Sequence, residues 1–255
     1  MSRIQELFKR KQNDILNVYC TAGYPRLDST LKVMRALQTH GADMIEIGMP
    51  YSDPLADGPV IQESSSQALQ NGMTLRVLFS QLKDCRKTIH LPLILMGYMN
   101  TVLQYGFEKF CADAKEVGID GLILPDLPPY EFESEYGAII KKYGLDFIFL
   151  VTPETPEQRI KQLDKLSSGF LYAVSSSSTT GSQKNMNDVA QYLERLRAMN
   201  LSNPILVGFG IGDRASFIEA CRHASGAIIG SAFIKAMKNS ENEEESVKQF
   251  LKSVI

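Results

Sequence analysis

The chain has 255 residues, of which 44% are hydrophobic and 22% are charged, a composition typical of a soluble globular protein. This length fits one large α/β barrel or two ordinary domains. The formal net charge of −2 argues against nucleic acid or an anionic membrane surface as a partner, because both favour a strongly basic protein.

The cysteines and the apolar runs add further exclusions. Cys20, Cys85, Cys111 and Cys221 lie far apart, with no CxxC pair and no histidine at ligand spacing, so we expect free thiols and no metal. The first residues contain no apolar run that resembles a signal peptide, and no run of about 18 apolar residues could span a bilayer. We therefore expect a cytoplasmic protein.

Short apolar runs alternate with longer amphipathic stretches along the chain. Helical spacing follows Asp28 and Thr74, which are typical N-cap residues, and Gly118 and Gly144 are expected to end helices. Pro156 suits the first turn of another helix. Eight runs are predicted to be strands: Ile15–Cys20, Met44–Gly48, Leu93–Gly97, Gly121–Leu124, Phe147–Val151, Phe170–Val174, Ile205–Val207 and Ala227–Ile229.

Eight strand–helix units predict parallel strands joined by right-handed crossovers. A doubly wound sheet uses the same alternation, but eight units without a linker favour a closed (β/α)8 barrel of the TIM type. We expect a single domain over residues 1–255, an extra N-terminal helix and a solvated start to the last helix at Glu241–Glu245. Function in such a barrel resides at the C-terminal ends of the strands.

Acidic residues gather after the second predicted strand. Glu46 lies between two isoleucines, so its carboxyl points either into the barrel or outward against the helices. It is either a structural hydrogen-bond partner of a neighbouring strand or a general acid and base with a raised pKa. Asp53 and Asp57 follow in a loop that Pro50 and Pro54 stiffen, where Asp57 is either a turn residue or a presented acid.

Glycines follow the last three predicted strands, at Thr180-Gly181, Gly208–Gly210 and Gly230-Ser231. Each one alone is most often a turn, but backbone N–H groups at three consecutive strand ends predict a phosphate site. A helix that begins after Ser231 would add its N-terminus. The polar segment Ser175–Asp188 is either a lid beside that site or a flexible connection.

Two kinds of side chain are missing from the predicted strand tops. The three histidines, His40, His90 and His223, fall at the opposite end of the barrel, which argues against a histidine-based metal site. No lysine occupies a strand top, which argues against Schiff-base chemistry.

The string EIGMPYSDPLADGP, from Glu46 to Pro59, closely resembles the signature of tryptophan synthase α subunits. Other strings that resemble the family occur in family order, so the resemblance covers essentially the whole chain. They are TAGYP at Thr21–Pro25, YMN at Tyr98–Asn100, PDLPPYE at Pro125–Glu131, GFGI at Gly208–Ile211 and IGSAFIK at Ile229–Lys235.

The resemblance implies a lyase that splits indole-3-glycerol phosphate into indole and D-glyceraldehyde 3-phosphate in tryptophan biosynthesis, with no metal or cofactor on this chain. It implies that Glu46 is the acid and base, that Asp57 accepts the indole N–H, and that Tyr172 offers a hydroxyl beside the reacting carbon. The other implied substrate contacts are Tyr19 at the indole ring, Gly181, Gly210, Gly230 and Ser231 at the phosphate, and Tyr98, Thr180 and Phe209.

The lid departs from the family pattern. Many members have Gly-Val-Thr-Gly where this chain has Ser178-Thr179-Thr180-Gly181, and the loss of a glycine restricts the backbone. The kinetics of lid closure and the stability of the lid are therefore not carried over from the family, whereas Glu46 and Asp57 are kept.

The resemblance also implies a partner. The family works as an α2β2 heterotetramer, in which the β subunit holds pyridoxal phosphate and condenses indole with serine. Pro50 and Asp53 would lie at the contact, and the loop that they share with Asp57 offers a route for allosteric activation.

Two alternative functions stay open. One is another phosphate-binding barrel enzyme, such as an indole-glycerol-phosphate synthase or a sugar-phosphate epimerase, and the other is a non-catalytic subunit that binds indole or activates the β subunit.

Overall fold

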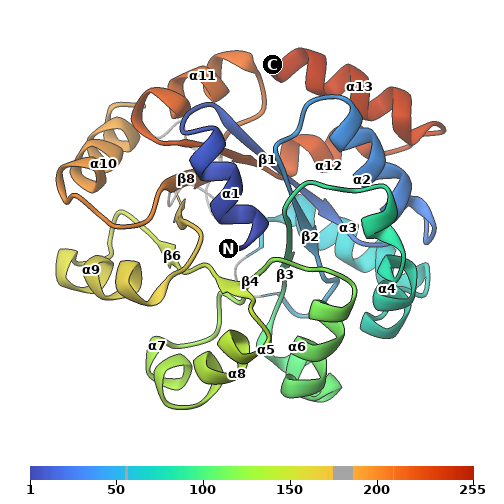
Figure 1. Cartoon of the computed structure of the whole chain (residues 1–255). Coiled ribbons are helices and arrows are strands. Elements are labelled where there is room, and N and C mark those ends of the chain that lie inside the picture. Colours follow the sequence, from blue (N-terminus) through green and yellow to red (C-terminus); the bar gives the residue numbers. More distant parts are fainter. Residues whose placement is uncertain (55–56, 175–185, 209) are drawn as a thin grey trace.

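The computed structural model describes the chain except residues 55–56, 175–185 and 209. Its strands form one parallel sheet with the order β5-β4-β3-β2-β1-β9-β8-β7-β6. Figure 1 shows these strands at the centre of the molecule, with helices arranged around them. The strands are β1 (Ile15–Thr21), β2 (Met44–Gly48), β3 (Leu93–Met96), β4 (Gly121–Ile123), β5 (Asp146–Phe147), β6 (Leu150–Val151), β7 (Leu171–Val174), β8 (Ile205–Gly208) and β9 (Gly226–Ile229).

Helices connect the strands and pack on the outside of the sheet. No helix within the described ranges has the length and apolar character needed to cross a membrane. The helices are α1 (Arg3–Arg10), α2 (Ser29–Thr39), α3 (Pro59–Gln70), α4 (Leu75–Leu82), η1 (Cys85–Lys87), α5 (Met99–Tyr105), α6 (Phe107–Glu116), α7 (Pro129–Glu131), η2 (Phe132–Tyr136), α8 (Gly137–Lys142), α9 (Glu157–Leu166), α10 (Met186–Ala198), α11 (Arg214–His223), α12 (Ser231–Met237) and α13 (Glu243–Val254).

The sheet closes on itself through the segment of residues 146–151. β5 and β6 stand at the two ends of the sheet order, yet Ile148 and Phe149 alone separate them along the chain. The N–H of Ile148 donates to Leu122 O of β4 at 3.0 Å, and Phe149 O accepts from Tyr172 N of β7 at 3.1 Å. The described strands thus form a barrel with eight strand positions, which confirms the predicted (β/α)8 fold. The strand predicted at Phe147–Val151 is found as two short pieces.

The barrel interior is mostly apolar, and helix α1 covers its N-terminal end (Figure 1). Ser2 and Gln5 form a capping box that begins this helix. Its buried residues, Ile4 and Leu7, pack against interior side chains of the strands, so the predicted N-terminal helix is confirmed. The interior cluster comprises Ile4, Leu7, Ile15, Met44, Ile94, Ile123, Ile148, Phe170, Tyr172, Leu206 and Ile228.

Several predicted helix ends are confirmed. Thr74 caps α4, because its hydroxyl accepts from Val77 N at 3.2 Å. Gly118 and Gly144 follow α6 and α8 with φ of +85° and +64°, in the left-handed region that glycine adopts without strain.

Other details differ from the prediction. Asp28 precedes α2, but its carboxylate bonds to Lys32 Nζ at 2.6 Å and does not cap the helix. Pro156 stands at the N-cap of α9, so the first helical residue is Glu157. The start of α13 is not wholly solvated, because Glu243 is buried and accepts from Ser29 Oγ at 2.7 Å and from Arg26.

Candidate active site

Glu46 points into the barrel. The interior cluster contains Met44, two residues before it on β2, whereas Ile45 and Ile47 pack with the outer core against the helices. Because strand side chains alternate between faces, Glu46 lies on the interior face, and its exposure is 1%. Of the two orientations that the sequence allowed for the Glu46 carboxyl, into the barrel or outward against the helices, the structure has the first.

The surroundings of Glu46 favour its protonated form. Burial raises the pKa of this carboxyl to about 8, and the nearby charge of Asp57 adds to the increase. Asn17 opposes it, because its side-chain amide donates to Glu46 Oε2 at 3.0 Å. A carboxyl with a pKa near neutrality can both give and take a proton, as a general acid and base must.

Asp57 stands at the start of α3, directly before the N-cap residue Gly58 and the helix's first proline. The side-chain amide of Gln62 donates to Asp57 O at 2.8 Å, which fixes the backbone at this position. Burial raises the pKa of the Asp57 carboxyl, and a hydrogen bond from Tyr98 opposes that increase. Tyr98 is therefore a partner of Asp57 in this structure.

Tyr19 on β1 and Tyr172 on β7 are buried beside Glu46, and each ring lies against a glycine of the next strand. A Cβ added at Gly48 would lie 2.0 Å from the Tyr19 hydroxyl, and one at Gly208 would lie 2.4 Å from that of Tyr172. Burial raises the pKa of both phenols, so both remain neutral hydrogen-bonding groups. These two glycines thus make room for the tyrosine rings.

The acids share one cavity with three of the predicted phosphate contacts. Its volume is about 80 Å³, which is room for a few water molecules. Gly210, with φ of +77°, has open space where a Cβ would be, and Gly230 directly precedes α12. The lining residues are Tyr19, Glu46, Asp57, Gly58, Ile61, Met96, Tyr172, Gly210, Ile211, Ile228, Gly230 and Ser231.

Some predicted site residues lie outside the described residues. These are Thr180, Gly181 and Phe209, together with the segment 175–185 that contains most of the predicted lid. The last three lid residues, 186–188, begin helix α10.

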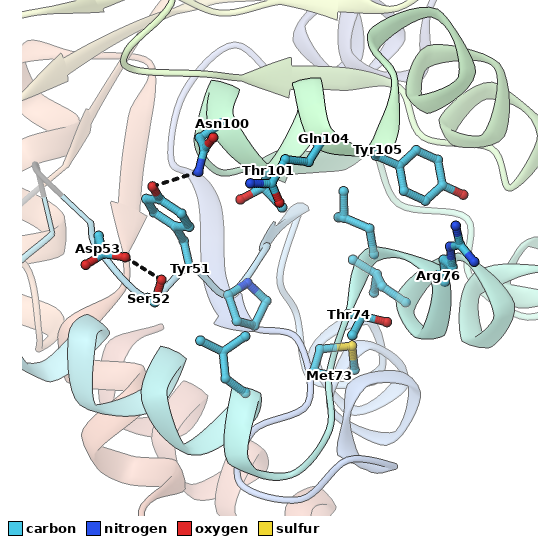
Figure 2. Close-up of a pocket in the computed structure, with 14 residues that line it drawn as sticks. Tyr51, Ser52, Asp53, Met73, Thr74, Arg76, Asn100, Thr101, Gln104 and Tyr105 are labelled. Atoms are coloured by element: carbon cyan, nitrogen blue, oxygen red, sulfur yellow. Dashed lines mark hydrogen bonds between the residues drawn. The ribbon is translucent and has the colours of Figure 1, made fainter.

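The predicted partner contacts Pro50 and Asp53 line a second, larger cavity of about 640 Å³ beside the site. Figure 2 shows Tyr51 of this loop pointing toward α5, where its hydroxyl accepts from Asn100 Nδ2 at 3.0 Å. The Tyr51 ring also packs on the Tyr98 ring, with centroids 5.3 Å apart. The loop that holds the two predicted contacts is therefore linked, through Tyr98, to Asp57.

Asn17, the amide that contacts Glu46, was not among the predicted site residues. A signal was available, because Asn17 is a polar residue in a mostly apolar strand and points to the same face of that strand as Tyr19. Met96 and Ile61, which add apolar wall to the cavity, carry no comparable signal.

Comparisons with known proteins show the family to which the chain belongs. The family model described as tryptophan synthase alpha chain matches residues 5–254. The tryptophan synthase alpha chain of Parabacteroides distasonis is 50% identical over 100% of this chain and 99% of its own length.

Solved structures are similar over their full length. Tryptophan synthase subunit alpha of Legionella pneumophila has a TM-score of 0.90 at 32% identity, covering 99% of this chain and 97% of that one. The tryptophan synthase structure from M. tuberculosis in its aminoacrylate-bound form has a TM-score of 0.86 at 30% identity, with 100% of both chains covered. This chain belongs to the tryptophan synthase alpha chain family.

Proposed function

We propose that this chain cleaves indole-3-glycerol phosphate to indole and D-glyceraldehyde 3-phosphate in the cavity at the mouth of the barrel. Membership of the family supports this reaction over those of the other phosphate-binding barrel enzymes considered from the sequence. The observation that carries the residue assignment is that Glu46 and Asp57 line one cavity with Gly210, Gly230 and Ser231.

The reaction breaks the bond between indole C3 and the adjacent glycerol carbon. The protonated Glu46 carboxyl gives its proton to indole C3, and the positive charge that develops on the ring nitrogen is stabilised by the Asp57 carboxylate. The carbon–carbon bond then breaks, its electron pair restores the aromatic ring, and the glycerol hydroxyl becomes an aldehyde. Glu46 takes the hydroxyl proton and returns to its starting form.

The remaining residues bind and orient the substrate. Tyr19 lies along the indole ring, Tyr172 places its hydroxyl beside the reacting carbon, and Tyr98 holds Asp57. Backbone N–H groups at Gly210, Gly230 and Ser231 bind the phosphate, which is remote from the bond that breaks. Binding energy at the phosphate can thus fix the reacting end in position.

We propose that the chain works with a β subunit in an α2β2 complex, with pyridoxal phosphate on the β subunit. Relatives include a tryptophan synthase complex from Pyrococcus furiosus, which is 34% identical to this chain. Pro50 and Asp53 form part of the contact, and the Tyr51–Tyr98 ring pair links it to Asp57.

A cytoplasmic location agrees with four free cysteines, since a reducing compartment keeps thiols reduced.

The test is the substitution Glu46→Gln, assayed for indole and glyceraldehyde 3-phosphate formation with a β subunit present. We expect substrate binding to persist and kcat to fall by about 10²–10⁴-fold, because the amide cannot transfer the proton. Near wild-type turnover by the folded variant would contradict the acid–base role of Glu46. A wild-type chain that binds substrate but forms no glyceraldehyde 3-phosphate would instead support the non-catalytic alternative.

A further inference from the structure

Asn17 is a buried polar residue that directly contacts Glu46. It lies on β1, its side chain has 0% exposure, and the structure pairs it in register with Met44, two residues before Glu46. Its Nδ2 donates to Glu46 Oε2 at 3.0 Å. This amide is therefore placed to hold one oxygen of the proposed acid and base.

Among the described residues, the titratable groups whose pKa is coupled to Glu46 are acids. Asp57 approaches from the loop after β2, Tyr172 from β7, and Tyr19 and Cys20 from β1. From β3, the residue in register is the apolar Ile94. Within the described part of the chain Glu46 forms no salt bridge, so the Asn17 amide is the group that favours its charged form there.

The second polar atom of Asn17 is also informative. Its Oδ1 is buried and has no hydrogen-bond partner among the described residues. An unsatisfied buried acceptor costs free energy, and a leucine of similar shape would avoid that cost. An amide can, however, turn about its terminal torsion and exchange donor for acceptor. In one orientation its N–H donates to the Glu46 carboxylate. In the other orientation its Oδ1 accepts from the Glu46 carboxylic acid.

We propose that Asn17 is a positioning residue for the cleavage reaction, which holds Glu46 in place in both of its protonation states. This inference rests on the proposed function, in which Glu46 gives a proton to indole C3 and later takes one from the glycerol hydroxyl. The N–H of Asn17 holds the carboxylate between these two transfers, and Oδ1 holds the acid before and after them. The proton itself passes between Glu46 and the substrate.

The principal test is Asn17→Leu, assayed as the α chain with its β subunit over a range of pH. The substitution removes a hydrogen bond to the charged form of Glu46 without touching the substrate. We expect kcat to fall about tenfold to a hundredfold while KM changes less than twofold. The alkaline limb of the kcat profile, where Glu46 loses its proton, should move up by about one pH unit, because the hydrogen bond lost to the carboxylate is stronger than the one lost to the carboxylic acid.

Two further variants guard against effects on folding. Ile123→Val removes one methylene from the same barrel interior, on β4, and should leave the pH profile in place. Asn17→Asp keeps the shape of the side chain but sets a second acid against Glu46, so it should also move the alkaline limb upward. If either folded Asn17 variant keeps the wild-type kcat and pH profile, the inference is overturned.

A direct titration separates this inference from the proposed function. Infrared difference spectra of the ligand-free complex would report the Glu46 carboxyl, identified by its loss in Glu46→Gln. In Asn17→Leu this band should titrate at higher pH than in the wild type, whatever the turnover. If Glu46→Gln is inactive while the band titrates unchanged in Asn17→Leu, the role of Asn17 alone fails. If Glu46→Gln retains turnover, the acid–base role of Glu46 fails as well, and if the wild type forms no glyceraldehyde 3-phosphate, the proposed cleavage itself fails.

Discussion

The two ends of the barrel both bury acidic side chains, but they surround them differently. At the N-terminal end Asp120 is 5% exposed and accepts from Arg3 at 2.9 Å, from Arg86 at 2.5 Å and from Leu93 N at 2.9 Å. At the C-terminal end Glu46 is equally buried, but its contact is the neutral amide of Asn17.

This difference separates an acid that supports the fold from the two acids that we propose to carry the chemistry. Asp120 joins α1, the segment after α4 and the start of β3, and two guanidinium groups compensate its burial. Glu46 and Asp57 have raised pKa values because burial is not compensated in this way. Perturbed acids that line a cavity are typical of functional sites.

After Glu46→Gln, the largest expected effect at the C-terminal end is that of Asp57→Asn. The amide keeps the size of the side chain but cannot offset the positive charge on the indole nitrogen, so we expect kcat to fall by about 10²–10³-fold. The measurement is indole release from indole-3-glycerol phosphate with a β subunit present. Unfolding by urea, followed in parallel, should show little loss of stability. A loss of stability without a loss of turnover would show that Asp57, like Asp120, supports the fold and not the reaction.

At the N-terminal end, Asp120→Ala should act in the opposite way. It leaves the partly buried guanidinium of Arg86 without its partner, so we expect the free energy of unfolding to fall by about 3–5 kcal/mol. The kcat of the folded variant should stay within twofold of the wild type. The matched control is Asp84→Ala, which breaks an exposed pair with Lys87 and should leave the free energy of unfolding almost unchanged.

The pH dependence of stability provides a third comparison. The pKa of Glu46 is raised from 4.5 to about 8 in the folded protein, so between these values the folded state holds a proton that the unfolded state has lost. The contribution of Glu46 to the free energy of unfolding is therefore fully present below pH 4.5. As the pH rises toward 8 this contribution is lost, and the free energy of unfolding falls by several kcal/mol. Urea unfolding of wild type and Glu46→Gln at several pH values should show this slope in the wild type alone. Parallel curves for the two proteins would contradict the raised pKa.

The sequence predicted the barrel well because the strand runs are strongly apolar and regularly spaced. It could not assign Glu46 to a face, because both faces of a barrel strand are buried: Met44 lies inside and Ile45 outside, and both are apolar. The local sequence pattern also predicted wrongly that Glu243 is exposed to solvent. Its partner Arg26 is 217 residues away along the chain, so the local pattern does not reveal their contact. The roles of residues at the mouth came from the family resemblance, since spacing alone does not bring distant loops together.

The smallest expected effect concerns Tyr98, which connects the loop of the predicted partner contact to Asp57. Tyr98→Phe removes the hydrogen bond to the Asp57 carboxyl but keeps the ring that packs on Tyr51, so the pKa of Asp57 should rise further. We expect kcat to fall about tenfold, the size of one hydrogen bond to a charged group. The measurement is kcat with and without the β subunit. Because the ring pair remains, the ratio of kcat with the β subunit to kcat without it should stay the same as in the wild type. A lower ratio would show that the Tyr98 hydroxyl, and not the packing of its ring, couples the partner contact to Asp57.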